Sequence, residues 1–259
     1  MDDPVPAPRK GRASTSGSSV EKALRVLEAS AAPDGPHRLA EIAAGAAVSK
    51  PSAHRILGML AAQGYVVADG AGTYGVGPRL RALAAGVGAD ETAGIDEVLA
   101  SLQHKVGNTV HLALRSGDTA TYIRKVDTDR PYRMASRVGM RLPLHCTAIG
   151  KCVLAHLPAE QVEAIAAASG LPARTANTIT DLDRLHAELA RVREHGVAVD
   201  DEENEETIRC LGAPVFDADG QPVGGISIST VTFLVPREEI ESYAPALREA
   251  ATALTGLLR

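Results

Sequence analysis

The N-terminal part of the chain alternates apolar residues at helical spacing with short breaks. Ser18 and Glu21 match a capping box, and apolar residues recur every three to four positions after them, so we predict a first helix that ends near Ser30. Prolines and a glycine between residues 31 and 37 predict a loop. Residues 1–17 hold Pro, Gly, Ser and charged residues without an apolar period, so we expect a disordered arm.

Two short helices with a tight break between them are predicted over residues 39–65. Apolar residues from Leu39 onwards form one helical face, and the break follows after Gly45. Ser49 is a candidate N-cap for the second helix, and Pro51 lies in its first turn, where the missing N–H costs nothing. We expect the buried face of this second helix to hold Ala53, Ile56, Leu57 and Leu60.

The other face of the second helix is polar and basic in its first turns. A helix, a tight turn and a second helix with such a start are typical of a helix-turn-helix, which places these side chains against DNA base edges and phosphates. The pattern of this stretch alone fits two amphipathic core helices equally well. The side chains concerned are Ser49, Lys50, Ser52, His54 and Arg55.

A β-hairpin is predicted directly after the second helix. Residues 65–67 and 73–76 have strand composition, and residues 69–72 between them have turn composition. Three helices followed by a small hairpin predict a winged helix-turn-helix over residues 18–78. Another helical pattern follows, and we assign residues 79–92 to a helix that links two domains.

Hairpins and helices alternate through the rest of the chain, residues 93–259. Because the strands follow one another in hairpins rather than in strand–helix–strand units, the pattern predicts an α+β fold with a largely antiparallel sheet. The predicted strands cover residues 109–114, 120–126, 197–199, 209–216 and 223–231, and the predicted helices cover about 93–105, 159–168, 181–195 and 236–258.

One helix start in this second domain is a candidate binding feature. Thr147 ends a proline-containing loop and is a good N-cap, which leaves the backbone N–H groups of Ala148, Ile149 and Gly150 free at a positive helix end. Such an end suits a carboxylate or a phosphate. Many helix ends bind only water, so this feature alone is weak.

Charge is uneven along the chain and narrows the candidate DNA-binding region. The formal charge is +2 over residues 1–79 and −7 over residues 80–259, which gives the overall −5. An acidic protein binds DNA when its basic residues gather on one face, and only the N-terminal part fits this condition. Arg9, Lys10 and Arg12 in the arm could lie along DNA, although a charged terminus without a role is equally common.

Cysteine usage and hydropathy favour a cytoplasmic protein without a membrane partner. Cys146, Cys152 and Cys210 are odd in number and form no CxxC pair, which argues against a disulfide framework. No apolar run approaches the roughly 18 to 20 residues of a membrane span. The N-terminus has no apolar segment of the kind found in secretory signals. No pattern in the chain requires a cofactor or a metal ion.

Two charged segments leave alternatives open. Residues 130–141 contain four arginines, which fit an anion or partner surface, although a solvated edge strand is the favoured interpretation. Residues 200–206 hold six acidic residues in seven positions, and we expect a solvated loop there. Adjacent carboxylates without a histidine partner are unspecific as a metal site.

From about Ser18 to Arg259 the chain resembles bacterial transcriptional regulators of the IclR family. The segments that carry the resemblance are LAEIAAGAAVSKPSAHRIL with GYVVADGAGTYGVGPRL, PLHCTAIGKCVLAHLP, and GVAVDDEENEETIRCLGAPVFDADGQPVGGISIS. The resemblance implies a winged helix-turn-helix joined by a helix to a GAF-like effector-binding domain. It also implies a dimer or a dimer of dimers that acts as a repressor or an activator. Ala47 stands where a larger leucine is usual, so we expect a thin core contact there.

The resemblance also implies where a ligand and DNA bind. In similar proteins a small carboxylate or aromatic acid lies where the TAIG helix begins. By position, this implies contacts from the amides of Ala148 and Ile149, the side chains of Asp200, Cys210, Ser227 and Ser229, and apolar walls from Met134 and Leu142. We therefore expect a sequence-specific DNA-binding regulator whose affinity for its operator is controlled by a small-molecule effector. Lys50, Arg55 and the arm would contact phosphates, and Ser49, Ser52 and His54 would contact base edges.

Two alternative functions would depend on the cysteines. A hydrolase would use Cys146 or Cys152 as nucleophile with His145 or His156 as base, but a thiolate nucleophile needs a positioned base and a third group that orients it. The sequence shows no such set. A metal- or redox-responsive regulator would use Cys146 and Cys210 with His145 and Asp200, since these side chains are possible zinc ligands.

Overall fold

The computed structural model describes residues 18–32, 35–86, 89–132 and 134–258 of the chain. Two compact units, Met1–Val87 and Gly88–Arg259, make up the protein. Arg9, Lys10 and Arg12, the expected disordered arm and Arg133 lie outside the described residues. No helix within the described ranges is long and apolar enough to cross a membrane.

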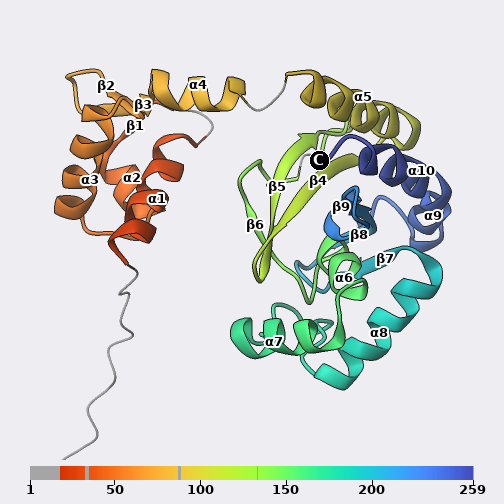
Figure 1. Ribbon diagram of the computed structural model, residues 1–259. Coiled ribbons are helices and arrows are strands. Elements are labelled where there is room, and N and C mark those ends of the chain that lie inside the picture. The colour runs from red at the N-terminus through yellow and green to blue at the C-terminus, as the bar shows by residue number, and fades with distance from the viewer. Residues whose placement is uncertain (1–17, 33–34, 87–88, 133, 259) are drawn as a thin grey trace, which may run out of the picture. The chain divides into compact units, whose positions relative to one another are not determined.

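The described part of the N-terminal unit contains four helices and a small antiparallel sheet (Figure 1). Its helices are α1 (Ser19–Ser30), α2 (Leu39–Gly45), α3 (Lys50–Ala62) and α4 (Pro78–Gly86), and its strands are β1 (His37–Arg38), β2 (Val66–Ala68) and β3 (Thr73–Val76). The sheet order β1-β3-β2 places the predicted hairpin beside a third strand. The predicted winged helix-turn-helix is confirmed.

Local sequence signals explain where these helices begin. The Ser18 hydroxyl accepts a hydrogen bond from the Glu21 amide, and the Glu21 side chain accepts one from the Ser18 amide, so the predicted capping box is formed. The Ser49 hydroxyl accepts a bond from the Ser52 amide at 3.4 Å, and Pro51 lies in the first turn of α3. Ala53, Ile56 and Leu57 are buried as predicted, and Leu60 is half-buried.

One expectation for this unit was wrong. Residues 31–37 were assigned to a loop, but His37 pairs with Tyr74 and Arg38 pairs with Thr73 to form β1. A strand of two residues is too short to show an alternating pattern. The expectation of a thin core contact at Ala47 agrees with the structure, because its side chain is exposed; its backbone is in the left-handed region with φ 51°. This conformation makes the tight turn between α2 and α3.

The second unit is built on one six-stranded antiparallel sheet in the order β6-β5-β4-β9-β8-β7. The strands are β4 (Thr109–Ser116), β5 (Thr119–Val126), β6 (Arg141–Pro143), β7 (Ala198–Asp201), β8 (Ile208–Phe216) and β9 (Pro222–Val231). The helices are α5 (Ala89–Val106), α6 (Ala148–Ala155), α7 (Ala159–Ser169), α8 (Leu182–His195), α9 (Arg237–Ser242) and α10 (Ala244–Thr255). The predicted α+β class with an antiparallel sheet is confirmed.

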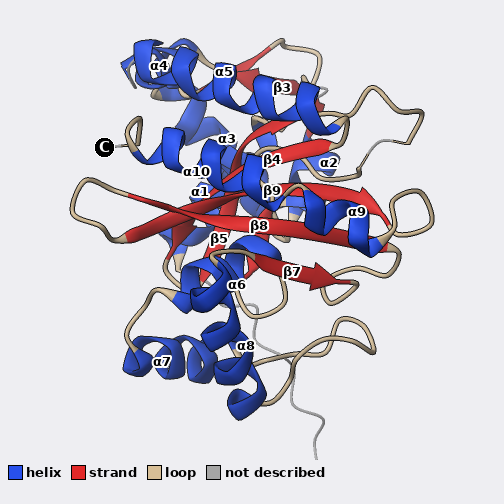
Figure 2. Ribbon diagram, turned by 90° about the vertical axis from the view of Figure 1, so that its right-hand side faces the viewer, coloured by secondary structure: helices blue, strands red, loops and turns tan. Residues whose placement is uncertain are grey.

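Helices cover both faces of this sheet (Figures 1 and 2). Strand residues alternate between two cores, as the two-residue period of a strand requires. Leu211 and Ile228 point into the core made with α5 and α10, whereas Ala113 and Tyr122 belong to the core made with α6 and α8. The neighbours of Ile228 along β9 are serines, so the α6 side of the sheet centre is polar.

Glycines let the start of α6 lie directly on the sheet. A Cβ atom on Gly212 would stand 2.8 Å from the backbone carbon of Ala148, and one on Gly225 would stand 3.1 Å from Ile149 Cγ2. A Cβ on Gly150 would stand 2.3 Å from the carbonyl oxygen of Leu144. Side chains at Gly212 and Gly225 would push α6 away from β8 and β9, and one at Gly150 would push it away from the segment that precedes it, so the three glycines fix the position of the helix start.

Two further expectations were corrected in this unit. The C-terminal helix predicted over residues 236–258 is two helices, because Pro245 provides no N–H for the next turn and therefore starts α10 afresh. The arginine-rich segment 130–141 was expected to be an edge strand, but only Arg141 belongs to one. The five strands predicted for this unit were found, but β6 was missed, because its three residues pair with β5 without showing a period of their own.

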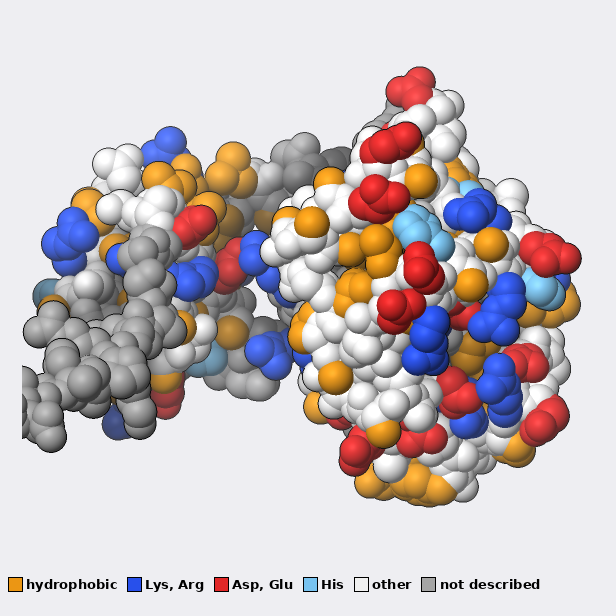
Figure 3. Space-filling view, turned by 90° about the horizontal axis from the view of Figure 1, so that it is seen from below, with side chains coloured by type: hydrophobic (Ala, Val, Ile, Leu, Met, Phe, Trp, Pro, Cys, Tyr) orange, Lys and Arg blue, Asp and Glu red, His pale blue; other side chains and the backbone are white. Residues whose placement is uncertain are grey.

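Surface charges of both signs are interspersed on the face of the C-terminal unit that Figure 3 shows at its right. Exposed ion pairs of this unit join Arg237 to Asp201 at 2.9 Å and to Glu241 at 2.8 Å, and Lys105 to Glu249 at 3.5 Å. Exposed pairs of this kind contribute little to stability. This face therefore has mixed charge rather than the basic character that DNA binding requires.

Candidate functional site

The first two turns of α3 present the polar side chains that the sequence singled out. Ser49, Lys50, His54 and Arg55 are exposed, and Ser52 is half-buried. The Ser49 hydroxyl donates to the Ser52 hydroxyl at 2.9 Å, which fixes both at the helix start. Within the described ranges neither Lys50 nor Arg55 forms an ion pair, so both cations are available to a partner.

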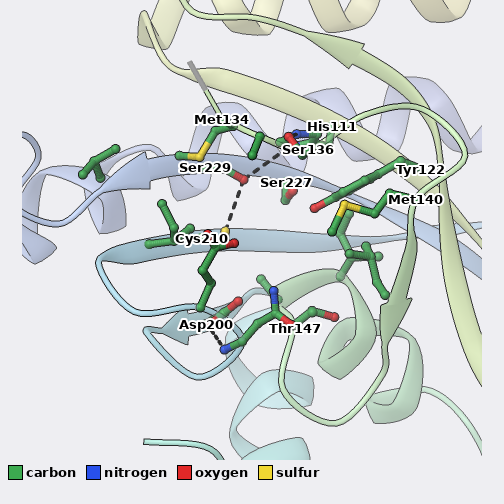
Figure 4. Close-up of a pocket in the computed structure, with 18 of the residues that line it drawn as sticks. His111, Tyr122, Met134, Ser136, Met140, Thr147, Asp200, Cys210, Ser227 and Ser229 are labelled. Carbon is green, nitrogen blue, oxygen red and sulfur yellow. Dashed lines mark hydrogen bonds between the residues drawn. The ribbon is translucent and has the colours of Figure 1, made fainter. Parts of the chain in front are cut away.

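A cavity of about 310 Å³ lies between the start of α6 and the α6 side of the sheet. All eight residues that the resemblance assigned to an effector line this cavity: Met134, Leu142, Ala148, Ile149, Asp200, Cys210, Ser227 and Ser229. Figure 4 shows the labelled side chains converging on it from several elements. Thr147, the predicted N-cap, also lines it. The sequence did not assign to the site the other lining residues, which are His111, Tyr122, Tyr132, Ala135, Ser136, Met140, Asn204, Glu205, Thr207, Ile208 and Val231.

The positive end of α6 opens at this cavity. The Thr147 hydroxyl accepts a hydrogen bond from the Gly150 amide at 3.1 Å and donates one to the Pro143 carbonyl at 2.7 Å, so the predicted N-cap is confirmed. The amides of Ala148 and Ile149 donate to no acceptor in the described part of the chain. Unpaired amides at a helix start attract an anion.

A hydrogen-bonded chain runs along the opposite wall of the cavity. The Cys210 thiol donates to the Ser229 hydroxyl at 3.2 Å, Ser229 lies 3.2 Å from His111 Nδ1, and His111 Nε2 lies 2.7 Å from the Ser136 hydroxyl (Figure 4). The His111 ring stacks on Tyr122 with centroids 4.4 Å apart. Burial lowers the pKa of His111 to about 3, so the imidazole is neutral near pH 7.

This chain has one consistent direction. If the thiol donates to Ser229, the Ser229 hydroxyl donates to Nδ1, and the single N–H of the neutral ring at Nε2 donates to Ser136. The Ser136 hydroxyl is then left to donate elsewhere. His111 was missed because its neighbours on β4 are apolar core residues, and only the register places it opposite Ser227 on the polar side of the sheet.

Asp200 is a buried carboxyl group in the cavity wall. Its side chain is 2% exposed, and its Oδ1 accepts hydrogen bonds from the amides of Glu203 at 2.9 Å and Asn204 at 3.3 Å. Burial raises the pKa of Asp200 to about 7. The described residues provide no ion-pair partner for it. Asp200 therefore orders the turn that follows β7 while keeping its charge uncompensated.

A second buried charge lies behind the cavity. Lys151 is 0% exposed, and its ammonium donates to the Val199 carbonyl at 2.5 Å, to Glu188 at 3.1 Å and to Glu203. Burial lowers the pKa of Lys151, but the two carboxylates outweigh burial and raise it, so the side chain is charged. Lys151 joins α6 to α8 and to the turn after β7.

The acidic run 200–206 is therefore not one solvated loop, as expected. Asp200 and Glu203 are buried, and Asp201 forms ion pairs with Arg209 at 2.6 Å and Arg237 at 2.9 Å. Asp200, Asp201 and Glu203 each have a different structural partner, whereas Glu205 and Glu206 are exposed. Sequence proximity suggested one shared environment, but alternate strand residues point to opposite faces.

The geometry does not favour the two alternatives built on cysteines. Burial raises the pKa of Cys146 and of Cys152 to about 12, so neither is a ready thiolate. His145 and His156 are bonded to the carbonyls of Pro172 and Cys152 rather than to a thiol. Among the described residues no group of three or more His, Cys, Asp or Glu side chains could hold a metal ion.

Comparison with known proteins gives consistent matches over both units. The family described as "Bacterial transcriptional regulator IclR C-terminal" matches residues 90–255, and the "IclR helix-turn-helix domain" matches residues 19–70. The chain is 35% identical over 240 residues to the probable transcriptional regulator SauR of Cupriavidus necator, covering 91% of this chain and 95% of that protein.

Solved structures match over nearly the whole chain. The crystal structure of the Thermotoga maritima IclR protein is 33% identical, has a TM-score of 0.70 and covers 92% of this chain and 97% of its own. An IclR homologue from Microbacterium hydrocarbonoxydans complexed with 4-hydroxybenzoate has a TM-score of 0.76, covers 93% of this chain and 99% of its own, and at 23% identity shows only a shared fold.

Proposed function

The chain belongs to the IclR family of bacterial transcriptional regulators, and on this premise we propose that a small organic acid bound in the cavity controls its affinity for operator DNA. The family establishes a DNA-binding transcriptional regulator with a C-terminal effector-binding domain, rather than an enzyme. The acid, its contacts and its effect on DNA binding are the proposed part.

The observation that carries the proposal is the open start of α6 in a cavity of small-molecule size. A volume of about 310 Å³ is at the lower end of the range typical of ligand sites, which suits a compact acid. The free amides of Ala148 and Ile149 would bind its carboxylate. Met134, Met140 and Leu142 would contact its carbon skeleton, and the serines and His111 would accept or donate to further polar groups.

DNA would be bound through α3. Lys50 and Arg55 are exposed and form no ion pair within the described ranges, so they would contact phosphates, and Ser49, Ser52 and His54 would contact base edges. Arg9, Lys10 and Arg12 would add phosphate contacts from the arm. The proposed organisation has residues 18–78 as the DNA-binding domain, residues 79–92 as the link and residues 93–259 as the effector-binding domain. The link was expected to be one helix, but α4 ends at Gly86 and α5 begins at Ala89.

The proposed working form is a cytoplasmic homodimer or dimer of dimers. A symmetric dimer would read two half-sites spaced by about one helical turn of DNA or a multiple of it. An effector that prefers one dimer geometry shifts the population between the DNA-competent and the DNA-incompetent state. The size of this shift is limited by the difference between the effector's affinities for the two states.

Replacing Ala148 with proline tests the helix-start site. Proline suits the first position of a helix, and Thr147 before it is already extended at φ −112° and ψ 148°, so α6 should form normally. The change removes one N–H from the site, and we expect affinity for the bound acid to fall on the order of 10-fold. The measurement is a thermal-shift titration with acetate, benzoate and 4-hydroxybenzoate, since a ligand stabilises the state that binds it.

Ala148→Gly is the matched control, because it keeps the amide and removes only the methyl group. We expect it to bind the same acids as the original protein. Equal binding by A148P and A148G would contradict a role for the α6 amides. If none of the acids stabilises the original protein, the assignment of a small carboxylate to this cavity is wrong.

A further inference from the structure

We infer that the cavity binds its acid together with one proton, and that Asp200 takes up this proton, so that the bound carboxylate faces a neutral carboxyl group. The inference rests on the proposed function, since it supposes that a carboxylate occupies the start of α6. It adds the ligand class, a monocarboxylate bound in a proton-linked manner, and a dependence of effector affinity on pH.

Asp200 and the helix start share one end of the cavity. Asp200 pairs with Cys210 across β7 and β8, and two residues further along β8 Gly212 touches the backbone of Ala148. Figure 4 shows Asp200 beside Thr147, at the opposite side of the cavity from His111. A carboxylate on the α6 amides would therefore have Asp200 as a near neighbour.

The hydrogen bonds of Asp200 leave one oxygen for a ligand. Both turn amides bond to Oδ1, whereas Oδ2 has no hydrogen-bond partner in the described part of the chain. An ionised Oδ2 would repel a carboxylate, but a protonated Oδ2 would donate a hydrogen bond to it. Two carboxyl groups in one desolvated site share a proton, because the proton replaces the repulsion between two charges with a hydrogen bond.

Among the residues that the structure describes, no free cation pairs with Asp200. The ionisable side chains around it are Lys151 on α6, Cys146 before α6, Cys210 on β8, Tyr122 on β5, Glu203 and Glu205 in the turn, and Arg174 beside Cys146, with Glu188 on α8 behind Lys151 and His111 on β4 across the cavity.

These neighbouring side chains do not cancel the repulsion between an ionised Asp200 and a bound carboxylate. Lys151 is already held by Glu188 and Glu203, and Arg174 donates its Nε–H to the Asn204 carbonyl at 3.0 Å. The thiols and Tyr122 have a pKa raised by burial, and they are neutral near pH 7. The pKa of Asp200 is itself about 7 before any ligand binds, so taking up a proton costs little at neutral pH.

The sign of the pH dependence follows from this pKa. Below pH 7 Asp200 already carries the proton and the acid binds at full strength, whereas above pH 7 the buffer must supply the proton and affinity falls up to tenfold per pH unit. The acid itself stays ionised above about pH 5, so its own titration does not contribute. Between pH 6.0 and pH 8.5 the dissociation constant should rise about 30-fold.

Isothermal titration calorimetry of the full-length protein measures both parts of the inference. Acetate, benzoate and 4-hydroxybenzoate are titrated at pH 6.0 and pH 8.5, and at pH 8.5 in two buffers of different ionisation enthalpy to count protons. We expect the 30-fold weakening and an uptake close to one proton per site at pH 8.5. Asp200→Asn keeps an Oδ1 acceptor for the turn amides and offers a permanent donor, so D200N should bind equally at both pH values without proton uptake.

Asp201→Asn is the matched control, because Asp201 is the next residue but pairs with Arg209 and Arg237 and does not line the cavity. D201N should keep the pH dependence. Equal affinity at both pH values in the original protein would overturn proton-linked binding while leaving the proposed function intact. A pH dependence that persists in D200N would overturn the role of Asp200. Absence of binding by every acid at both pH values would contradict the proposed function as well as this inference.

Discussion

Replacing Lys151 with methionine is expected to lower the free energy of unfolding of the C-terminal unit by about 3–5 kcal/mol. Methionine has a similar length, so packing is nearly kept, but Glu188 and Glu203 lose the buried cation that both contact. Glu203 already has one buried carboxylate oxygen without a hydrogen-bond partner. Breaking a buried pair by removing one partner leaves an uncompensated charge, which is why the expected loss is large.

Urea unfolding followed by circular dichroism measures this loss, and two variants make it interpretable. K151M/E203Q should recover a large part of the stability, since it removes the buried Glu203 charge that K151M alone would leave without a partner. Lys105→Met is the control, because Lys105 is exposed and its contact with Glu249 is 3.5 Å long, so we expect a change within about 0.5 kcal/mol. A loss below 1 kcal/mol for K151M would show that this cluster does not hold α6 to α8 and the turn.

Replacing Lys50 and Arg55 together with alanine is expected to weaken DNA binding on the order of 100-fold in moderate salt, because two phosphate contacts are lost. The slope of the logarithm of affinity against the logarithm of salt concentration should fall by about 2. Fluorescence anisotropy with a DNA fragment from upstream of the protein's own gene measures both quantities. Both side chains are exposed, so the fold should be unaffected.

Arg184→Ala is the control for this variant, since Arg184 is an exposed arginine on α8 of the other unit. It should leave the affinity and the salt slope unchanged. Ser52→Ala and His54→Ala should alter the preference among DNA sequences more than the salt slope, since base contacts carry specificity and phosphate contacts carry charge. An unchanged salt slope in the Lys50 and Arg55 variant would exclude α3 as the phosphate-contacting element.

Elements with a strong period were predictable from the sequence. The helix from Lys50 shows its cap, its early proline and its buried face within 13 residues, and the N-cap at Thr147 is equally local. β1 was not predictable, because two residues carry no period. The break at Tyr243 was missed because an apolar stripe continues through it, although Pro245 was visible in the sequence.

Some residues of the site could likewise be predicted from the local sequence, whereas others depend on contacts between distant segments. The open start of α6 could be derived from residues alone, whereas Asp200, Cys210, Ser227 and Ser229 were placed by resemblance and lie around the same cavity. His111 and Lys151 were missed by both routes. Each is a polar residue inside an apolar run, and only the strand register and the packing of α8 show what it contacts.

The central claim is that an acid in the cavity changes DNA binding, and one titration tests it most directly. The affinity of the full-length protein for its upstream DNA is measured by anisotropy at pH 6.5, with and without the acid that gives the largest thermal shift. Allosteric coupling of the usual size predicts a change of at least 5-fold in the original protein, and little change in A148P at the same acid concentration. An acid that binds the protein while leaving its affinity for DNA unaltered would contradict the claim.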